Sequence, residues 1–124
     1  MNPVTGLSLG RIAIGAVSLY DPAMAAKQLM LDPASNPQVS YVTRLFGTRE
    51  IAIGLATLLA SGGTRRNLVL LGVLVDAADA ATGYLATKDG SAPVKAGQRM
   101  TAVASGAVVA GLLGLRTGRK RAEA

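Results

Sequence analysis

The hydrophobic pattern of the chain consists of four long apolar runs separated by short polar connections. Each run is close to the roughly 20 residues that a helix needs to cross a membrane, although the first and the last are short. A short amphipathic stretch between the first two runs is expected to form a helix along a membrane interface. The four runs cover about residues 3–20, 37–60, 64–87 and 97–115, and the amphipathic stretch covers residues 23–31.

Helix start and stop signals lie in the polar connections. Asp21, which precedes a proline, ends the first run, and two glycines end the second. Asn36 also precedes a proline, which is the arrangement of an N-cap residue followed by proline at the first helical position. Thr64 is expected to cap the third run, because a threonine side chain accepts hydrogen bonds from the first backbone N–H groups of a helix.

The third run distinguishes a membrane protein from the alternative, a soluble four-helix bundle. A soluble bundle would give each helix a charged face opposite its apolar face. The only charged residues in the middle of this run are Asp76 and Asp79, and residues 68–75 are apolar all the way round. The sequence therefore predicts an all-α, integral membrane four-helix bundle. Residues 1–115 would form one transmembrane domain, and residues 116–124 would form a basic cytoplasmic tail.

Composition narrows the chemistry that such a protein could perform. Half of the 124 residues are hydrophobic, but only three Tyr and one Phe are aromatic. Small and aliphatic residues fill the space instead, which is typical of close-packed membrane helices. The chain has no Cys and no His, which excludes disulfides and thiolate nucleophiles and removes the commonest metal ligand and general base. We expect no cofactor.

The net charge of +6 is concentrated at two places along the chain. The connection after the second run and the C-terminal tail carry six basic residues and one acidic residue, whereas the other two connections are neutral. The positive-inside rule then places the basic connection, the tail and the N-terminus in the cytoplasm. No basic segment follows the first methionine, so we expect no signal peptide. A nucleic-acid-binding protein would spread its basic residues over one face, so nucleic acid is not an expected partner. The six basic residues are Arg65, Arg66, Arg116, Arg119, Lys120 and Arg121.

Charged residues inside the apolar runs are the candidates for function. An unpaired Arg or Asp at the centre of a membrane helix costs roughly 2.5–3.5 kcal/mol on insertion scales, so these residues need partners. Helical wheels place most of them on stripes of small or polar residues that face the interior. We expect Arg11 to pair with Glu50 and Asp76 near the midplane of the membrane. The complete expected network consists of Arg11, Arg44, Glu50, Asp76, Asp79 and Arg99.

A second layer of charges is expected further out in the membrane. Asp79 lies about 4.5 Å outward of the first layer, at 1.5 Å per residue, and its expected partner is Arg44 or Arg99. Arg49 points away from the stripe of Glu50, so we assign it to a helix flank or to a partner subunit. We expect no metal on the carboxylates, because the nearby arginines compete for them.

One segment carries a family resemblance. The pattern Arg-x-x-Gly-x-Arg-Glu-x-x-x-Gly from Arg44 to Gly54, followed by the paired aspartates of the third run, resembles a family of small, uncharacterised four-helix bacterial membrane proteins. The layout is similar to that of DoxX-type membrane proteins. This resemblance implies a four-helix fold in a bacterial plasma membrane and a family defined as a domain of unknown function. It implies no activity and no catalytic residue.

These observations predict a multi-pass protein of the lipid bilayer whose charged network binds a small amphiphile, a partner membrane protein or a second copy of the chain. The alternative is a membrane-embedded isomerase or cyclase that acts on a lipophilic substrate, with Asp76 or Glu50 as general acid and Asp79 as a further candidate. An enzyme would need a cavity beside an acid that lacks a tight arginine partner. A purely structural network would have every acid paired and no cavity.

Overall fold

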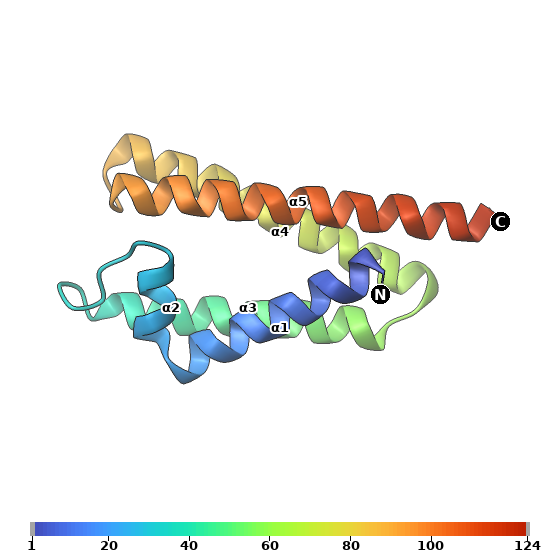
Figure 1. The fold of residues 1–124 in the computed structure, drawn as a ribbon, viewed down its shortest axis with the longest axis horizontal. Coiled ribbons are helices and arrows are strands. Elements are labelled where there is room, and N and C mark those ends of the chain that lie inside the picture. The colour runs from blue at the N-terminus through green and yellow to red at the C-terminus, as the bar shows by residue number, and fades with distance from the viewer. Residues whose placement is uncertain (1, 124) are drawn as a thin grey trace.

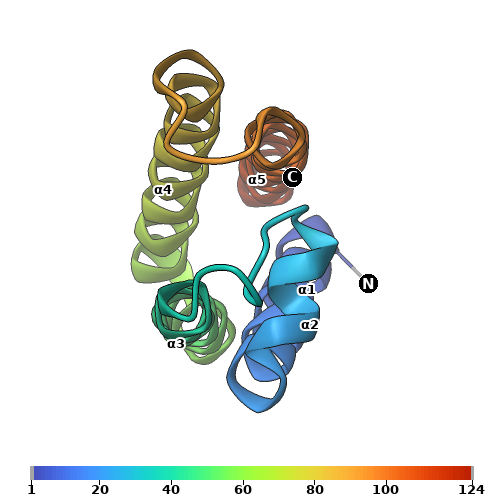
Figure 2. The same cartoon turned by 90° about the vertical axis from the view of Figure 1, so that its left-hand side faces the viewer.

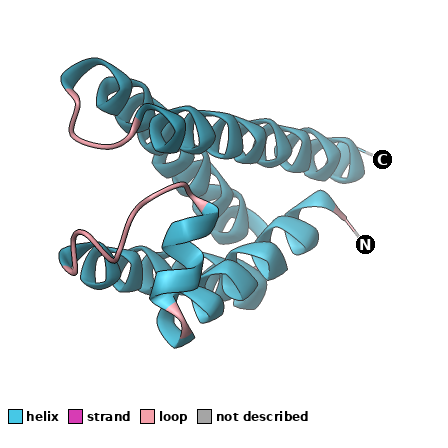
Figure 3. Cartoon of the chain, turned by 60° about the vertical axis from the view of Figure 1, so that its left-hand side comes forward, coloured by secondary structure: helices cyan, strands magenta, loops and turns pink. Residues whose placement is uncertain are grey.

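The protein is described by a computed structural model that covers residues 2–123, with the backbone alone for residues 119–123. The described residues form five helices and no strand (Figure 3). This confirms the prediction of an all-helical chain. The helices are α1 (Pro3–Tyr20), α2 (Pro22–Gln28), α3 (Gln38–Leu59), α4 (Gly62–Asp89) and α5 (Val94–Glu123).

The helix boundaries follow the hydrophobic pattern closely at some ends and depart from it at others. Helix α1 has the predicted bounds, and the side-chain oxygen of Asn2 caps it by accepting from the backbone N–H of Thr5 at 2.8 Å. The prediction that Thr64 caps α4 is wrong, because the helix begins two residues earlier. Gly62 has a φ of 58°, a left-handed conformation that glycine adopts readily, so the chain turns directly into the helix.

Helix α5 is longer than the apolar run that predicts it. It begins three residues before residue 97 and continues through residues 116–123, the segment expected to be a separate tail. Basic residues are good helix formers, so the helix does not have to end where the apolar pattern ends. The side chains of Arg119, Lys120 and Arg121, which the charge analysis uses, lie outside the described part of the structure.

The four long helices form two antiparallel pairs, α1 with α3 and α4 with α5 (Figure 1). Viewed from the end, α1, α3, α4 and α5 form a ring, and α2 lies beside α1 and α3 (Figure 2). Contacts within each pair are far more extensive than contacts between the pairs. The N-terminus, the C-terminus and the α3–α4 connection lie at the same end of the molecule (Figure 1).

Glycines allow the two helices of each pair to meet backbone to backbone. A Cβ atom added to Gly15 of α1 would lie 2.5 Å from the carbonyl oxygen of Gly47 in α3. A Cβ atom added to Gly97 of α5 would lie 2.5 Å from the carbonyl oxygen of Gly83 in α4. No side chain fits at such distances, so these positions set the spacing of both pairs. Small residues at helix crossings are typical of membrane helices.

The distribution of buried and exposed residues is the reverse of that in a soluble protein. Among the side chains of residues 2–118, only four hydrophobic residues are buried, and three of them are alanines. Large apolar residues such as Leu74 (67% exposed) and Leu85 (59% exposed) lie on the outside. The buried polar residues are Ser8, Arg11, Ser18, Thr43, Glu50, Thr57 and Asp76. The protein therefore has a polar interior and an apolar surface.

Within the described residues, two helices are long and apolar enough to cross a membrane. They are α4 and residues 94–118 of α5, and only 22% and 17% of their most apolar stretches are buried in the protein. A core helix of a soluble protein would bury much more of its apolar surface.

We predict that the substitution Gly15→Ala destabilises the protein by about 1–3 kcal/mol, because the added methyl group overpacks the α1–α3 crossing. Gly10→Ala, on the same helix, is the matched control. A Cβ atom at Gly10 has nothing within 4 Å, and replacing a helical glycine with alanine favours the helix by up to about 1 kcal/mol. Thermal unfolding of both variants in the same detergent measures the difference. Equal melting temperatures would contradict the close approach of α1 and α3.

Candidate functional site

Arg11 is buried at the centre of the molecule and connects three helices. Its Nη1 donates to Oε2 of Glu50 in α3 at 2.8 Å and to Oδ1 of Asp76 in α4 at 3.1 Å. Its Nη2 donates to the other oxygen of Asp76, so this pair is bidentate. The side chains of all three residues are only 6% exposed. The ion pairs that the sequence predicts for Arg11 are therefore present.

Arg49 forms the second set of ion pairs. Its Nη1 and Nη2 donate to the two oxygens of Asp79 at 3.2 and 2.6 Å, and Nη2 also donates to Oε1 of Glu50 at 3.3 Å. The guanidinium lies 5.1 Å from the ring centre of Phe46, within range of a cation–π interaction. The prediction that leaves Arg49 out of the charged network is therefore wrong. Neighbouring residues lie about 100° apart around a helix, but the long side chain of Arg49 still reaches Glu50 and Asp79.

Arg44 and Arg99 do not pair with Asp79, so the prediction of that second layer is wrong. The Nε of Arg44 donates to the backbone oxygen of Leu19 at 3.4 Å, near the C-terminal end of α1. The Nη1 of Arg99 donates to the backbone oxygen of Gln28 at 3.0 Å, at the end of α2. Carbonyl groups in the last turn of a helix lack partners within the helix, and a cation also suits the negative end of the helix dipole. Both arginines are exposed and act on helix ends.

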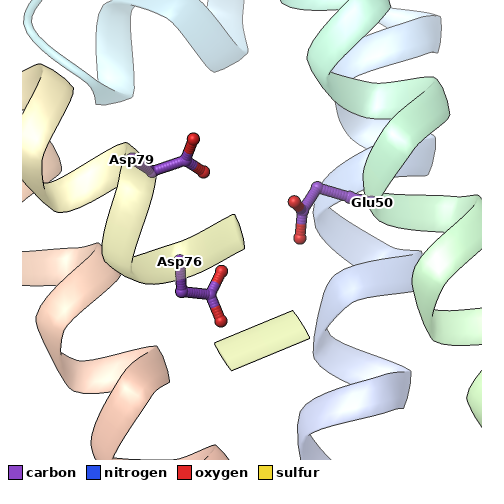
Figure 4. A group of neighbouring side chains, drawn as sticks. All are labelled: Glu50, Asp76 and Asp79. Carbon is purple, nitrogen blue, oxygen red and sulfur yellow. The ribbon is translucent and has the colours of Figure 1, made fainter. Parts of the chain in front are cut away.

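The carboxylates form one continuous cluster instead of two layers. Glu50 faces Asp76 and Asp79 from the opposite side of the space between α3 and α4 (Figure 4). One oxygen of Glu50 accepts from Arg11 and the other accepts from Arg49, so Glu50 bridges two bidentate Arg–Asp pairs. We call these five residues the charge cluster. It contains three carboxylates and two guanidinium groups.

A cavity of about 610 Å³ lies beside the charge cluster. Most of its lining residues come from α1 and α5, and residues of α2, α3 and α4 complete it. Four members of the cluster, Arg11, Glu50, Asp76 and Asp79, line the cavity, and Arg99 lines it as well. The rest of the lining is mainly apolar and small. Cavities of roughly 300–1,000 Å³ with apolar walls and a few polar groups are typical of small-molecule sites.

The three carboxylates of the cluster have a spacing that a metal ion could use. One oxygen from each of Glu50, Asp76 and Asp79 lies within 4.8 Å of the others. Each carboxylate already accepts hydrogen bonds from a guanidinium group, however, and two positive charges lie beside them. A divalent cation would have to displace both arginines, so the arrangement does not suit a resident metal.

The structure combines one feature expected of an enzyme with one feature expected of a structural network. A cavity is present beside the acids, as an enzyme or a binding protein requires. Each of the three acids is paired with an arginine, as a structural network requires. Each acid already bonds a guanidinium group, so none can face a substrate as a general acid without breaking an ion pair. The arrangement is better suited to binding than to acid catalysis.

Comparisons of the chain with models of protein families, with curated proteins and with solved structures found no match. The function of the site must therefore be argued from its own geometry.

We predict that breaking the ion pair between Arg11 and Asp76 lowers the free energy of unfolding. Arg11→Met leaves Asp76 without a partner, so we expect a loss of about 3–5 kcal/mol, as for other broken buried ion pairs. Asp76→Leu should cost less, because Arg11 keeps its bond to Glu50. The double variant should lose less stability than the sum of the two single losses. It removes both side chains of the pair, so Asp76 is not left buried without a partner. A double-mutant cycle on unfolding in detergent measures this coupling.

Arg44→Met is the control for this cycle, because Arg44 is exposed and bonds only a backbone oxygen. Its effect should stay within about 0.5 kcal/mol. Strict additivity of the Arg11 and Asp76 losses would show that the two side chains do not stabilise each other.

Proposed function

We propose that this protein is a four-helix membrane protein that binds a small lipophilic molecule in the cavity beside the charge cluster. The observation that carries the proposal is the cavity itself, which combines apolar walls with a charged end. In this arrangement the apolar part of a ligand contacts the walls formed by α1 and α5. Its polar group meets the charged side chains that α1, α3 and α4 supply.

Membrane insertion is supported by the distribution of polar and apolar residues. The apolar exterior suits lipid, and the charged interior satisfies the buried polar groups that lipid cannot. All four long helices cross the membrane in this proposal, although among the described helices only α4 and α5 combine the length and mean hydropathy of a membrane span. The end that holds both termini also holds the basic residues Arg65 and Arg66, so it faces the cytoplasm of a bacterial cell.

The cavity favours a small molecule over a protein partner. A stable protein interface needs about 800 Å² of matched surface on each side. The charge cluster is instead reached through a cavity whose volume suits one small ligand. Gly10 and Ala13 of α1 leave room for such a ligand, because neither has a side chain long enough to fill the cavity.

We predict that single cysteines label from opposite sides of the membrane. The chain has no native cysteine, so each variant carries one target. Ser35→Cys and Ser91→Cys lie in the α2–α3 and α4–α5 connections and should react with an impermeant maleimide on intact spheroplasts. Ser61→Cys lies in the α3–α4 connection and should react only after permeabilisation. All three positions are exposed.

Labelling of all three cysteines from one side would contradict the four-crossing arrangement. Release of the protein from membranes by alkaline carbonate without detergent would contradict membrane insertion itself.

We predict that a neutral photoreactive alcohol with a decyl chain labels the cavity. The probe carries an alkyl diazirine and is added to the protein in phosphatidylcholine nanodiscs, and labelled peptides are mapped by mass spectrometry. Labelling should concentrate on lining residues such as Leu7, Val17 and Val103. Gly10→Phe should reduce that labelling severalfold, because the ring occupies the cavity.

Gly106→Phe is the matched control for this experiment. Gly106 is also a helical glycine with open space around an added Cβ atom, but it does not line the cavity. Equal labelling of the two variants, or labelling spread evenly over the apolar surface, would contradict a ligand site in the cavity.

A further inference from the structure

We propose that the polar group of the bound molecule carries one positive charge, and that Glu50 is the residue that selects it. The ligand is then a lipophilic cation, such as an alkyl ammonium compound. This inference rests on the proposed function, because it names the class of molecule that the cavity binds.

The charges of the cluster do not balance. Arg11 and Asp76 form one bidentate pair, and Arg49 and Asp79 form another, so each pair is neutral by itself. Glu50 is the fifth member, and its carboxylate is shared between the two arginines. Three carboxylates against two guanidinium groups leave one negative charge without a counterpart within the cluster.

That surplus charge lies where water cannot easily compensate for it. The side chain of Glu50 is 94% buried, since only 6% of it is exposed, and it lines the cavity. A charge in a low-dielectric interior is costly unless an opposite charge lies close by. A neutral ligand would leave the surplus charge as it is, and an anionic ligand would add to it. A ligand with one positive charge compensates for it.

Arg99 does not supply the missing charge. It lines the cavity but is exposed, and its guanidinium donates to the backbone oxygen of Gln28. No carboxylate among the described side chains lies within ion-pair distance of it. Arg99 therefore lies at the exposed part of the cavity wall, and its guanidinium bonds the end of α2 and not Glu50.

The ligand class also fits the shape of the site. The walls beside the charge cluster include apolar residues of two helices, such as Leu7, Ile14 and Val103. One alkyl chain or a small hydrophobic body can contact these walls while its positive group approaches the carboxylates. The single surplus charge matches a monovalent cation better than a divalent one.

The test compares three competitors that share a decyl chain and differ in the charge of the head group. They are decyltrimethylammonium, decanol and decyl sulfonate, each competing with the neutral photoreactive probe in phosphatidylcholine nanodiscs. Concentrations are expressed as mole fraction in the bilayer, so that differences in partitioning cancel. We expect the cation to displace the probe at a mole fraction about tenfold lower than decanol, and the sulfonate to be the weakest competitor.

Glu50→Gln tests the role of the surplus carboxylate. Both arginines keep their aspartate partners in this variant, and the cluster becomes neutral. The ratio between the effective mole fractions of decanol and the cation should fall from about tenfold to about one. Asp89→Asn is the matched control, because it removes the same charge from an exposed end of α4, away from the cavity. Its ratio should equal that of the unmodified protein.

The outcomes separate this inference from the proposed function. Failure of the neutral probe to label the cavity would overturn the proposed function. Labelling with equal competition by the cation and decanol would leave the binding site in place and overturn the choice of a cation. A preference for the cation that persists in Glu50→Gln would overturn the role of Glu50. If that variant does not fold, the ranking of the three competitors on the unmodified protein still decides the class of ligand.

Discussion

The ion pairs between the two helix pairs, buried at Arg11 and partly buried at Arg49, are the interaction on which the rest of the structure depends. Within each pair, glycines bring the helices into backbone contact, but contacts between the pairs are sparse. Both arginines of the charge cluster, Arg11 and Arg49, belong to the α1–α3 pair, and both of their aspartate partners belong to α4. Charge-assisted hydrogen bonds between these residues therefore join the two halves.

This mode of assembly also explains the cavity. The charge cluster joins the two helix pairs between α1, α3 and α4, and close packing of Gly114 of α5 against Val4 of α1 joins them near one end. Between these two contacts, α1 and α5 leave a space that their small residues do not fill. The same carboxylates and guanidinium groups that join the pairs line this space, so the structural and the proposed binding roles belong to one set of residues. Glu50 differs from the others because neither Arg–Asp pair requires it.

Residues 44–54 of α3 combine helix-crossing glycines with three of the charged residues that bond other helices. Gly47 meets Gly15 at the helix crossing, and a Cβ atom at Gly54 would lie 2.7 Å from the backbone oxygen of Ser8. Arg49 and Glu50 enter the charge cluster, and Arg44 bonds the end of α1. Each residue of the pattern Arg-x-x-Gly-x-Arg-Glu-x-x-x-Gly therefore has a physical role in the fold.

The sequence by itself determined the helical elements and the first ion pairs. The length of the apolar runs and the signals at their ends favour helices over strands, and a charge as isolated as Asp76 must find its partner on another helix. The tertiary structure alone decided the rest. Arg49 joins Asp79, and Arg44 and Arg99 turn to helix ends, because a flexible arginine side chain is longer than the distance between neighbouring stripes on a helix. The sequence could not predict the cavity either. Its size depends on the distance between α1 and α5, and the periodicity of a single helix does not specify that distance.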